Sequence, residues 1–219
     1  MSNNKKIPLE YIVREPQVRT KRPPVIFMLH GYGSNEEDLF SFADALPAEY
    51  MIISFRAPYH LVTFGYAWYM INFDAEQENF SDNEQAIASR DLIMQCIEEL
   101  CKLYDLDNKN ITLLGFSQGS ILSMAIALSY PKKIHNVIAL NGYVNKDILK
   151  EGYARENHSA TRFYVSHGAS DQVIPVEWAR QTSEFLKNLG IKYKYEEFPI
   201  GHGVSPQNFY SFRDWLTEQ

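Results

Sequence analysis

Cysteine is scarce in this sequence: only Cys96 and Cys101 occur among 219 residues. If the segment that holds them is helical, a step of five residues separates them by about 7.5 Å along the helix axis, too far for a disulfide bond. Two cysteines are also too few for a disulfide-stabilised scaffold or a cysteine-rich zinc module. We therefore expect two reduced thiols and a cytoplasmic protein.

Basic runs are missing as well, and we expect no export signal. The chain has 21 Lys and Arg against 27 Asp and Glu, a formal net charge of −6, which argues against nucleic-acid binding. No apolar stretch follows Lys5 and Lys6, as it would in a secretory signal. Residues 111–131 carry no charge, but Gly, Ser and Gln interrupt them. We expect a buried strand, a turn and a helix there, and no integral membrane association.

Low-complexity tracts, repeats and linkers are also absent, and short apolar runs alternate with helix-like segments. The apolar share of 45% is enough for a sizeable core. Apolar runs predict strands at 25–29, 51–55, 111–114, 137–140, 163–166 and 192–198. Capping residues and hydrophobic stripes predict helices from near Asn35 to before Pro47, from near Ser81, and over 121–129, 176–189 and 206–216.

This alternation indicates one α/β domain over residues 1–219, with a mostly parallel central sheet and helices on both faces. In such sheets ligands bind beyond the carboxyl ends of the strands. Residues that directly follow a strand are therefore the first candidates for chemistry.

One motif follows the strand at 111–114: Gly115-Phe-Ser117-Gln-Gly119. G-x-S-x-G between a strand and a helix is the pattern of a nucleophile elbow, a turn so tight that larger neighbouring side chains would block it. It would place the Ser117 hydroxyl at a helix N-terminus, where the helix dipole favours developing negative charge. The pentapeptide alone recurs by chance, so the flanking strand and helix carry the prediction that Ser117 is a nucleophile.

A nucleophilic serine needs a base, and the base needs an acid to orient it. His202 lies between small residues, in a loop after the last expected strand, and is the candidate base. Asp171 follows another strand and is the candidate acid, although Asp also favours turns and helix caps. Asp147 is a rival acid, but it follows no strand closely. The order Ser117, Asp171, His202 is that expected of this fold class.

An oxyanion needs at least two aimed N–H donors. Gln118, the residue after the serine, supplies one backbone N–H, and Tyr32, in the Gly-rich turn after the first expected strand, is the candidate for the second. We expect His30 to pack or hydrogen-bond locally. The sequence has no metal-ligand histidine pair, dinucleotide fingerprint or phosphate loop, so we expect no cofactor and no metal.

The segment at 57–73 has no Lys, Arg, Asp or Glu and is rich in aromatic residues. Long loops in compact domains are often functional. Two interpretations remain open: an apolar wall for substrate beside Ser117, or a loop whose aromatics are simply buried. For the first, the candidate substrate-binding residues are Phe64, Tyr66, Trp68 and Phe73.

Taken together, the motifs at residues 29–33, 115–119, 167–175 and 201–203 resemble the phospholipase/carboxylesterase family of α/β-hydrolases, which includes acyl-protein thioesterases and small bacterial carboxylesterases. The resemblance runs from about Val25 to Leu216. It implies the α/β-hydrolase fold without a large cap domain, a triad of Ser117, Asp171 and His202, and oxyanion N–H groups from Tyr32 and Gln118. Two departures are Ser120 in place of a second glycine and the high aromatic content near Trp68, and they leave the substrate preference open.

The sequence therefore predicts a serine hydrolase that cleaves carboxylic esters through an acyl-enzyme, with a small-molecule or lipid ester as substrate. One alternative is a thioesterase or lysophospholipase acting on long acyl chains. A further alternative is a dienelactone-hydrolase-like enzyme, but such an enzyme would need Cys in place of Ser117. A non-catalytic hydrolase-fold binding protein is the alternative of another class. The oligomeric state stays open, a homodimer included.

Overall fold

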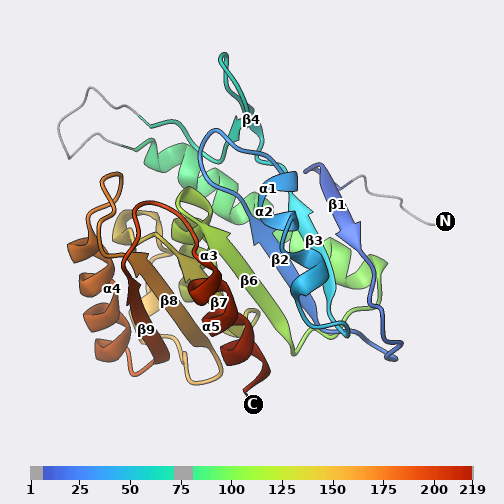
Figure 1. Ribbon diagram of the computed structural model, residues 1–219. Coiled ribbons are helices and arrows are strands. Elements are labelled where there is room, and N and C mark those ends of the chain that lie inside the picture. The colour runs from blue at the N-terminus through green and yellow to red at the C-terminus, as the bar shows by residue number, and fades with distance from the viewer. Residues whose placement is uncertain (1–6, 72–80, 219) are drawn as a thin grey trace.

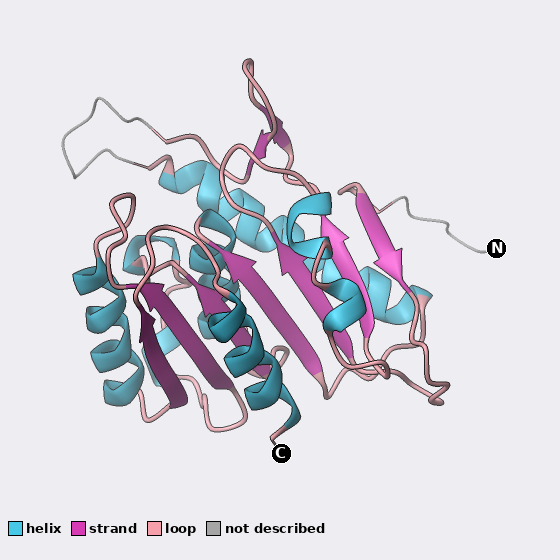
Figure 2. Cartoon of the chain, viewed as in Figure 1, coloured by secondary structure: helices cyan, strands magenta, loops and turns pink. Residues whose placement is uncertain are grey.

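The computed structural model describes residues 7–71 and 81–218, which fold around a seven-stranded sheet (Figures 1 and 2). The strands lie in the order β1-β3-β2-β6-β7-β8-β9. Their bounds are Tyr11–Arg14 (β1), Val25–Leu29 (β2), Met51–Phe55 (β3), Ile111–Phe116 (β6), Asn136–Leu140 (β7), Arg162–Gly168 (β8) and Lys192–Phe198 (β9). Among these described strands β1 pairs antiparallel with β3, and the other neighbours pair in parallel. The expected mostly parallel sheet is confirmed.

Helices cover both faces of this sheet, and this is why its central strands β2, β6 and β7 are almost entirely buried. The first face is covered by α2 (Asn83–Leu103), α3 (Gln118–Ser129) and α4 (Val176–Asn188), and the second by α1 (Glu37–Phe40), the 3₁₀ turn η1 (Ala43–Ala45) and α5 (Pro206–Thr217). Side chains alternate along each strand. In β2, Phe27 enters the core of the first face and Met28 that of the second, and both are fully buried.

The helix expected to start at Asn35 is much shorter than predicted. It is split into the single turn of α1 and the 3₁₀ turn η1. The capping box predicted at Ser34 is wrong: the Ser34 hydroxyl donates to the Asp38 carboxylate at 2.8 Å, and its backbone forms a β-bridge with Tyr66. The competing backbone pairing therefore takes Ser34 away from the helix.

The second predicted capping box lies one residue from the true helix start. Asp82, not Ser81, is the N-cap of α2, and its carboxylate accepts from the Gln85 N–H at 3.0 Å. The predicted helix itself is confirmed over Asn83–Leu103. The cysteines on it, Cys96 and Cys101, are both free, and burial raises their thiol pKa values to about 11 and about 12.

Some elements had no counterpart in the sequence prediction. The edge strand β1 is short and half-buried. The aromatic segment contains the two-residue strands β4 (Tyr59–His60) and β5 (Tyr66–Ala67), a hairpin that projects from the body of the protein (Figure 1). Two further 3₁₀ turns, η3 (Lys146–Ile148) and η4 (Tyr153–Arg155), follow β7. Within the described ranges, the helices are too short or too polar for any of them to cross a membrane.

Candidate active site

Ser117 lies on the sharp turn between β6 and α3. Its backbone has φ 52° and ψ −118°, a strained positive-φ conformation that costs a non-glycine residue of order 1–3 kcal/mol. The turn depends on the glycines around it. A Cβ on Gly119 would come within 1.9 Å of the Leu29 carbonyl oxygen, and one on Gly115 within 2.3 Å of the Gly119 carbonyl oxygen. Sterics therefore demand Gly at both positions and hold the serine at the carboxyl edge of the sheet.

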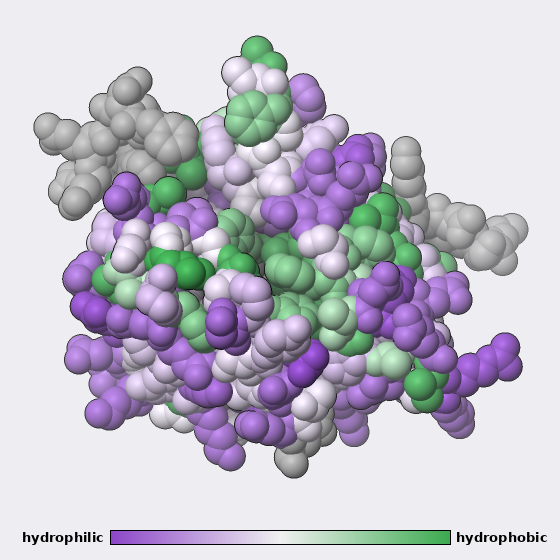
Figure 3. Space-filling view, viewed as in Figure 1, coloured by the Kyte–Doolittle hydropathy of each residue, from purple (hydrophilic) through white to green (hydrophobic). Residues whose placement is uncertain are grey.

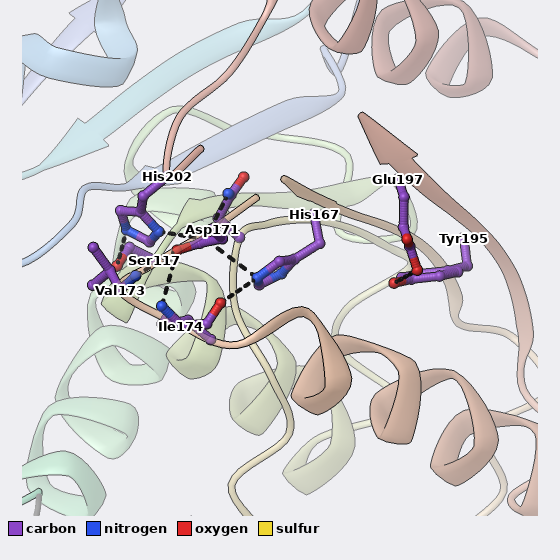
Figure 4. A network of polar contacts seen from close by, with 9 residues as sticks. Ser117, His167, Asp171, Val173, Ile174, Tyr195, Glu197 and His202 are labelled. Atoms are coloured by element: carbon purple, nitrogen blue, oxygen red, sulfur yellow. Dashed lines mark hydrogen bonds and ion pairs between the residues drawn. The ribbon is translucent and has the colours of Figure 1, made fainter. Parts of the chain in front are cut away.

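His202 connects this serine to Asp171 (Figure 4). Its Nε2 lies 2.9 Å from the Ser117 Oγ, and its Nδ1 lies 2.7 Å from the Asp171 Oδ2. A carboxylate only accepts, so Nδ1 carries the proton and a neutral ring leaves Nε2 free to accept from the serine. The serine is 8% exposed and the imidazole 17%, so the pair is sheltered yet open to a ligand.

Asp171 is fully buried behind the imidazole. Burial pushes the pKa of its carboxyl up, but hydrogen bonds from His202, Asn141 and the N–H groups of Ile174 and Val173 outweigh it, so the pKa is lowered. The carboxylate accepts from the Asn141 Nδ2 at 3.0 Å and from the two N–H groups at 2.8 and 2.9 Å. The residue is thus held as an anion beside His202.

Asp147, the rival acid, and His30 both lie outside the hydrogen-bonded chain of Ser117, His202 and Asp171. Asp147 lies in η3, at the rim of the cavity described below, and His202 is paired with Asp171 instead. His30 is fully buried and bonds locally, as expected: its ring nitrogens lie 2.7 Å from the Gly31 carbonyl oxygen and 3.1 Å from the Ala57 N–H nitrogen. Burial lowers the pKa of His30, so this ring is neutral at pH 7.

The two candidate oxyanion donors lie next to the elbow. Gln118 is the first residue of α3, where backbone N–H groups have no intrahelical acceptor. Tyr32 lies in the turn after β2, and both residues line the same cavity as Ser117. Gly31, the residue before Tyr32, approaches the candidate nucleophile closely, since a Cβ on Gly31 would lie 3.4 Å from the Ser117 Cβ.

A cavity of about 960 Å³ opens over Ser117 and His202. In the space-filling view, hydrophobic residues gather around a hollow in this face, below the projecting hairpin (Figure 3). Part of the lining is aromatic: Tyr143 and Trp178 pack edge to face with ring centroids 4.7 Å apart, and Phe185 follows Trp178 on α4. Toward α1 the lining is polar, with Ser34 and Asp38. The cavity therefore suits a ligand with both apolar and polar parts.

The aromatic segment contributes differently from what its sequence indicated. Phe64 is 71% exposed on the hairpin, and neither it nor Tyr66 lines the cavity. Trp68 is fully buried, and its indole donates to the His30 carbonyl at 2.8 Å. The structure thus places none of these three candidates in the cavity lining. Trp68 packs in the core, the Phe64 ring lies 3.3 Å from the Cβ position of Gly33, and Tyr66 pairs with Ser34. Phe73 lies outside the described residues.

From the same segment, Tyr69 and Ile71 do line the cavity. The Gln118 side chain holds this stretch in place: its Oε1 accepts from the Trp68 N–H at 2.8 Å, and its Nε2 donates to the Tyr69 carbonyl at 2.7 Å. The elbow and the cavity wall are therefore joined through one buried amide.

Sequence reasoning missed several residues of this site. Asn141 and His167 both reach Asp171, and Tyr143 and Trp178 form the aromatic wall. Asn141 directly follows a predicted strand, so the rule that found Asp171 could have found it. Trp178 lies on a helix face that only the folded arrangement turns toward Ser117. Across the described residues, no group of three or more His, Cys, Asp or Glu could hold a metal ion.

Solved structures share this architecture. The crystal structure of esterase PE8 matches with a TM-score of 0.82 and 22% identity, covering 96% of this chain and 98% of that one. The Bacillus cereus carboxylesterase matches with a TM-score of 0.82 and 19% identity, covering 96% and 94%. The chain therefore has the α/β-hydrolase fold.

The sequence relationship is more specific than the fold. The model of the phospholipase/carboxylesterase family matches residues 11–218, and the chain belongs to that family of hydrolases. Acyl-protein thioesterase 1 of Emericella nidulans is 26% identical over 210 residues, which cover 85% of this chain and 86% of that protein. The Oryza sativa subsp. japonica protein named "Probable carboxylesterase" is 29% identical over 109 residues, and there the match covers 49% of this chain and 41% of the relative.

Proposed function

We propose that this protein hydrolyses carboxylic esters, with Ser117 as nucleophile, His202 as general base and acid, and Asp171 as the group that orients His202. The observation that carries the proposal is the continuous chain of hydrogen bonds from Asp171 Oδ2 through the imidazole to Ser117 Oγ, at 2.7 and 2.9 Å. Each of the three residues follows a different strand, so the fold has to assemble them.

In the first half-reaction, Ser117 Oγ attacks the ester carbonyl while its proton passes to His202 Nε2. The buried Asp171 carboxylate stabilises the imidazolium that forms. When the tetrahedral intermediate collapses, the bond to the alcohol breaks and the alcohol leaves with the proton from Nε2. Water then attacks the acyl-enzyme, with His202 again taking and returning the proton, and the carboxylic acid is released.

The negative oxygen of the intermediate needs donors that are already in position. The backbone N–H groups of Gln118 and Tyr32 are our candidates. The first lies at the positive end of α3, and the second lies in the turn that approaches Ser117 through Gly31. The loss of one such donor typically lowers kcat by about 10²–10³.

For the substrate, we propose an ester with an apolar group that packs against Trp178, Tyr143 and Phe185. These rings line the cavity that holds Ser117, and aromatic walls favour apolar groups of matching shape. A second candidate activity is thioester hydrolysis, because the relative matched over most of its length is named as an acyl-protein thioesterase. Both reactions would use the same acyl-enzyme.

The test is a panel of p-nitrophenyl esters and acyl-thioesters from two to sixteen carbons, assayed with the native chain, Ser117→Ala and His202→Ala. Ester turnover that is lost by several orders of magnitude in both variants would support the proposal. A higher kcat/KM on long-chain thioesters than on esters would favour the second activity. A folded native chain that turns over nothing in the panel would contradict both and favour a binding protein.

A further inference from the structure

A second histidine contacts the proposed triad acid from behind (Figure 4). The Nε2 of His167, on β8, lies 2.8 Å from the Ile174 carbonyl oxygen and 3.2 Å from the Asp171 Oδ2. Its side chain is fully buried. Nδ1, its other ring nitrogen, is buried with no hydrogen-bond partner among the described residues.

These contacts define the protonation of the His167 ring. A carbonyl and a carboxylate can only accept, so Nε2 must carry a hydrogen and donate it. A proton on Nδ1 would be a buried donor with no acceptor, which is costly. The ring is therefore the neutral Nε2–H tautomer. Its one N–H donates to the Ile174 carbonyl, with the Asp171 Oδ2 3.2 Å from the same nitrogen.

The position of this N–H matters because it links His167, through Ile174, to the hydrogen bonds that hold the Asp171 carboxylate. Asp171 Oδ1 accepts from the Ile174 N–H at 2.9 Å, while the Ile174 carbonyl accepts from His167. The same Asp171 Oδ2 that receives His202 also faces His167 and Asn141. His167 thus limits where the carboxylate can point.

We propose that His167 is a positioning residue of the triad: its Nε2–H holds the Ile174 carbonyl and lies against Asp171 Oδ2, and so keeps the Asp171 carboxylate directed at His202. This inference rests on the proposed hydrolase function. His167 itself does not line the substrate cavity.

The charged groups around His167 also come from the neighbouring strand and helix. Glu197 on β9 lies opposite His167 in the pairing of β8 with β9. The Glu197 carboxylate accepts hydrogen bonds from Arg180 on α4 and from the Tyr195 hydroxyl. The hydrogen bond from the Arg180 guanidinium is the main reason that the pKa of Glu197 is lowered to about 2. Glu197 is therefore an anion throughout the working range of pH and adds no titration of its own there.

The test compares His167→Phe, which keeps a ring but removes the donor, with His167→Gln, whose side-chain amide restores one. We expect His167→Phe to lower kcat on the order of 10-fold with little change in KM. Without the N–H dipole that lies against it, the Asp171 carboxylate becomes more basic and stabilises the His202 imidazolium better. The acidic limb of the kcat/KM profile should therefore move to higher pH, and His167→Gln should move it back.

His158 offers a matched control. It is also buried, with its Nε2 2.8 Å from the Tyr153 carbonyl oxygen and its Nδ1 without a partner among the described residues. His158→Phe removes the same kind of group with no contact to Asp171. We expect it to leave kcat and the pH profile unchanged, even if it lowers the melting temperature.

A folded His167→Phe protein with the native kcat and the native pH profile would overturn the inference. If that variant does not fold, nitrogen-15 shifts of the imidazoles in the native chain decide: an Nδ1–H tautomer or an imidazolium at His167 near pH 7 would overturn it, and a neutral Nε2–H ring would support it. Failure of the hydrolase proposal is distinguishable, because the native chain itself would then show no turnover.

Discussion

The side-chain oxygen of Gln118 accepts a hydrogen bond from the backbone N–H of Trp68 at 2.8 Å. The residue after the proposed nucleophile is thereby fixed to a segment that walls the cavity. Trp68 in turn donates its indole N–H to the His30 carbonyl, in the turn after β2. Both sides of the candidate oxyanion site are thus tied to one buried tryptophan.

Replacing Gln118 by Leu should therefore destabilise the fold and loosen the cavity wall. The change leaves the Trp68 N–H and the Tyr69 carbonyl buried without their partner, at a cost of about 1–3 kcal/mol. Gln95→Leu is the control, because the Gln95 amide bonds the Glu99 carboxylate on an exposed helix face, where changes stay within about 0.5 kcal/mol. Denaturant unfolding of both variants measures the difference, and equal losses would contradict the role given to Gln118.

Gly119→Ala should abolish the elbow. Its Cβ would lie 1.9 Å from the Leu29 carbonyl oxygen, a backbone clash that must move β2 or α3. We expect a loss of more than about 3 kcal/mol of stability, or no soluble protein.

The control for steric effects is Gly190→Ala. Gly190 has φ +67° but open space around its Cβ position, so its replacement costs only backbone strain, about 1 kcal/mol. Unfolding free energies of the two variants should differ clearly. If Gly119→Ala were as stable as Gly190→Ala, the close approach of the elbow to β2 would be wrong.

Asp171 should make stability depend on pH in a defined direction. Its pKa is lowered in the folded protein, so its contribution is fully present above the unfolded-state pKa, about 3.9, and is lost as the pH falls through the lower folded value. The advantage of the native chain over Asp171→Asn should shrink as the pH is lowered below about 4. Chemical unfolding between pH 7 and pH 3 measures it, and a constant difference between the two proteins would show that this carboxylate has no depressed pKa.

Trp178→Ala should weaken the enzyme selectively for esters with a bulky apolar group, because it removes a ring from the cavity lining. We expect a roughly tenfold lower kcat/KM for aromatic or medium-chain esters and a small effect on acetate esters. Val62→Ser is the control, since Val62 is 100% exposed and does not line the cavity. Identical kcat/KM profiles of Trp178→Ala and the native chain across the ester panel would remove these rings from the substrate site.

Much of the fold could be predicted because its signals are local. The strand Val25–Leu29 is apolar at every position, and the stop of α4 is marked by Gly190 in a left-handed conformation. Edge strand β1 was not predicted because it has only four residues and all of them are half-buried. The capping box predicted at Ser34 was wrong because the β-bridge of Ser34 with Tyr66 competes with helix capping. No local sequence pattern indicates a partner 32 residues away.

The site shows the same division. Ser117, Asp171 and His202 could be found from the rule that chemistry follows strand ends, and the structure brings all three together. The cavity wall could not be found in this way. An aromatic residue looks the same in sequence whether it packs in the core, as Trp68 does, or lines a cavity, as Trp178 does, because only the folded neighbours decide.

Ser117 as the nucleophile is tested by labelling with a fluorophosphonate probe, which reacts with activated serines, followed by mass spectrometry of the labelled peptide. We expect the native chain to be labelled at Ser117, Ser117→Ala to stay unlabelled, and His202→Ala to be labelled far more slowly. A folded native chain that stays unlabelled, or carries the label at another serine, would contradict the assignment of Ser117 as the nucleophile.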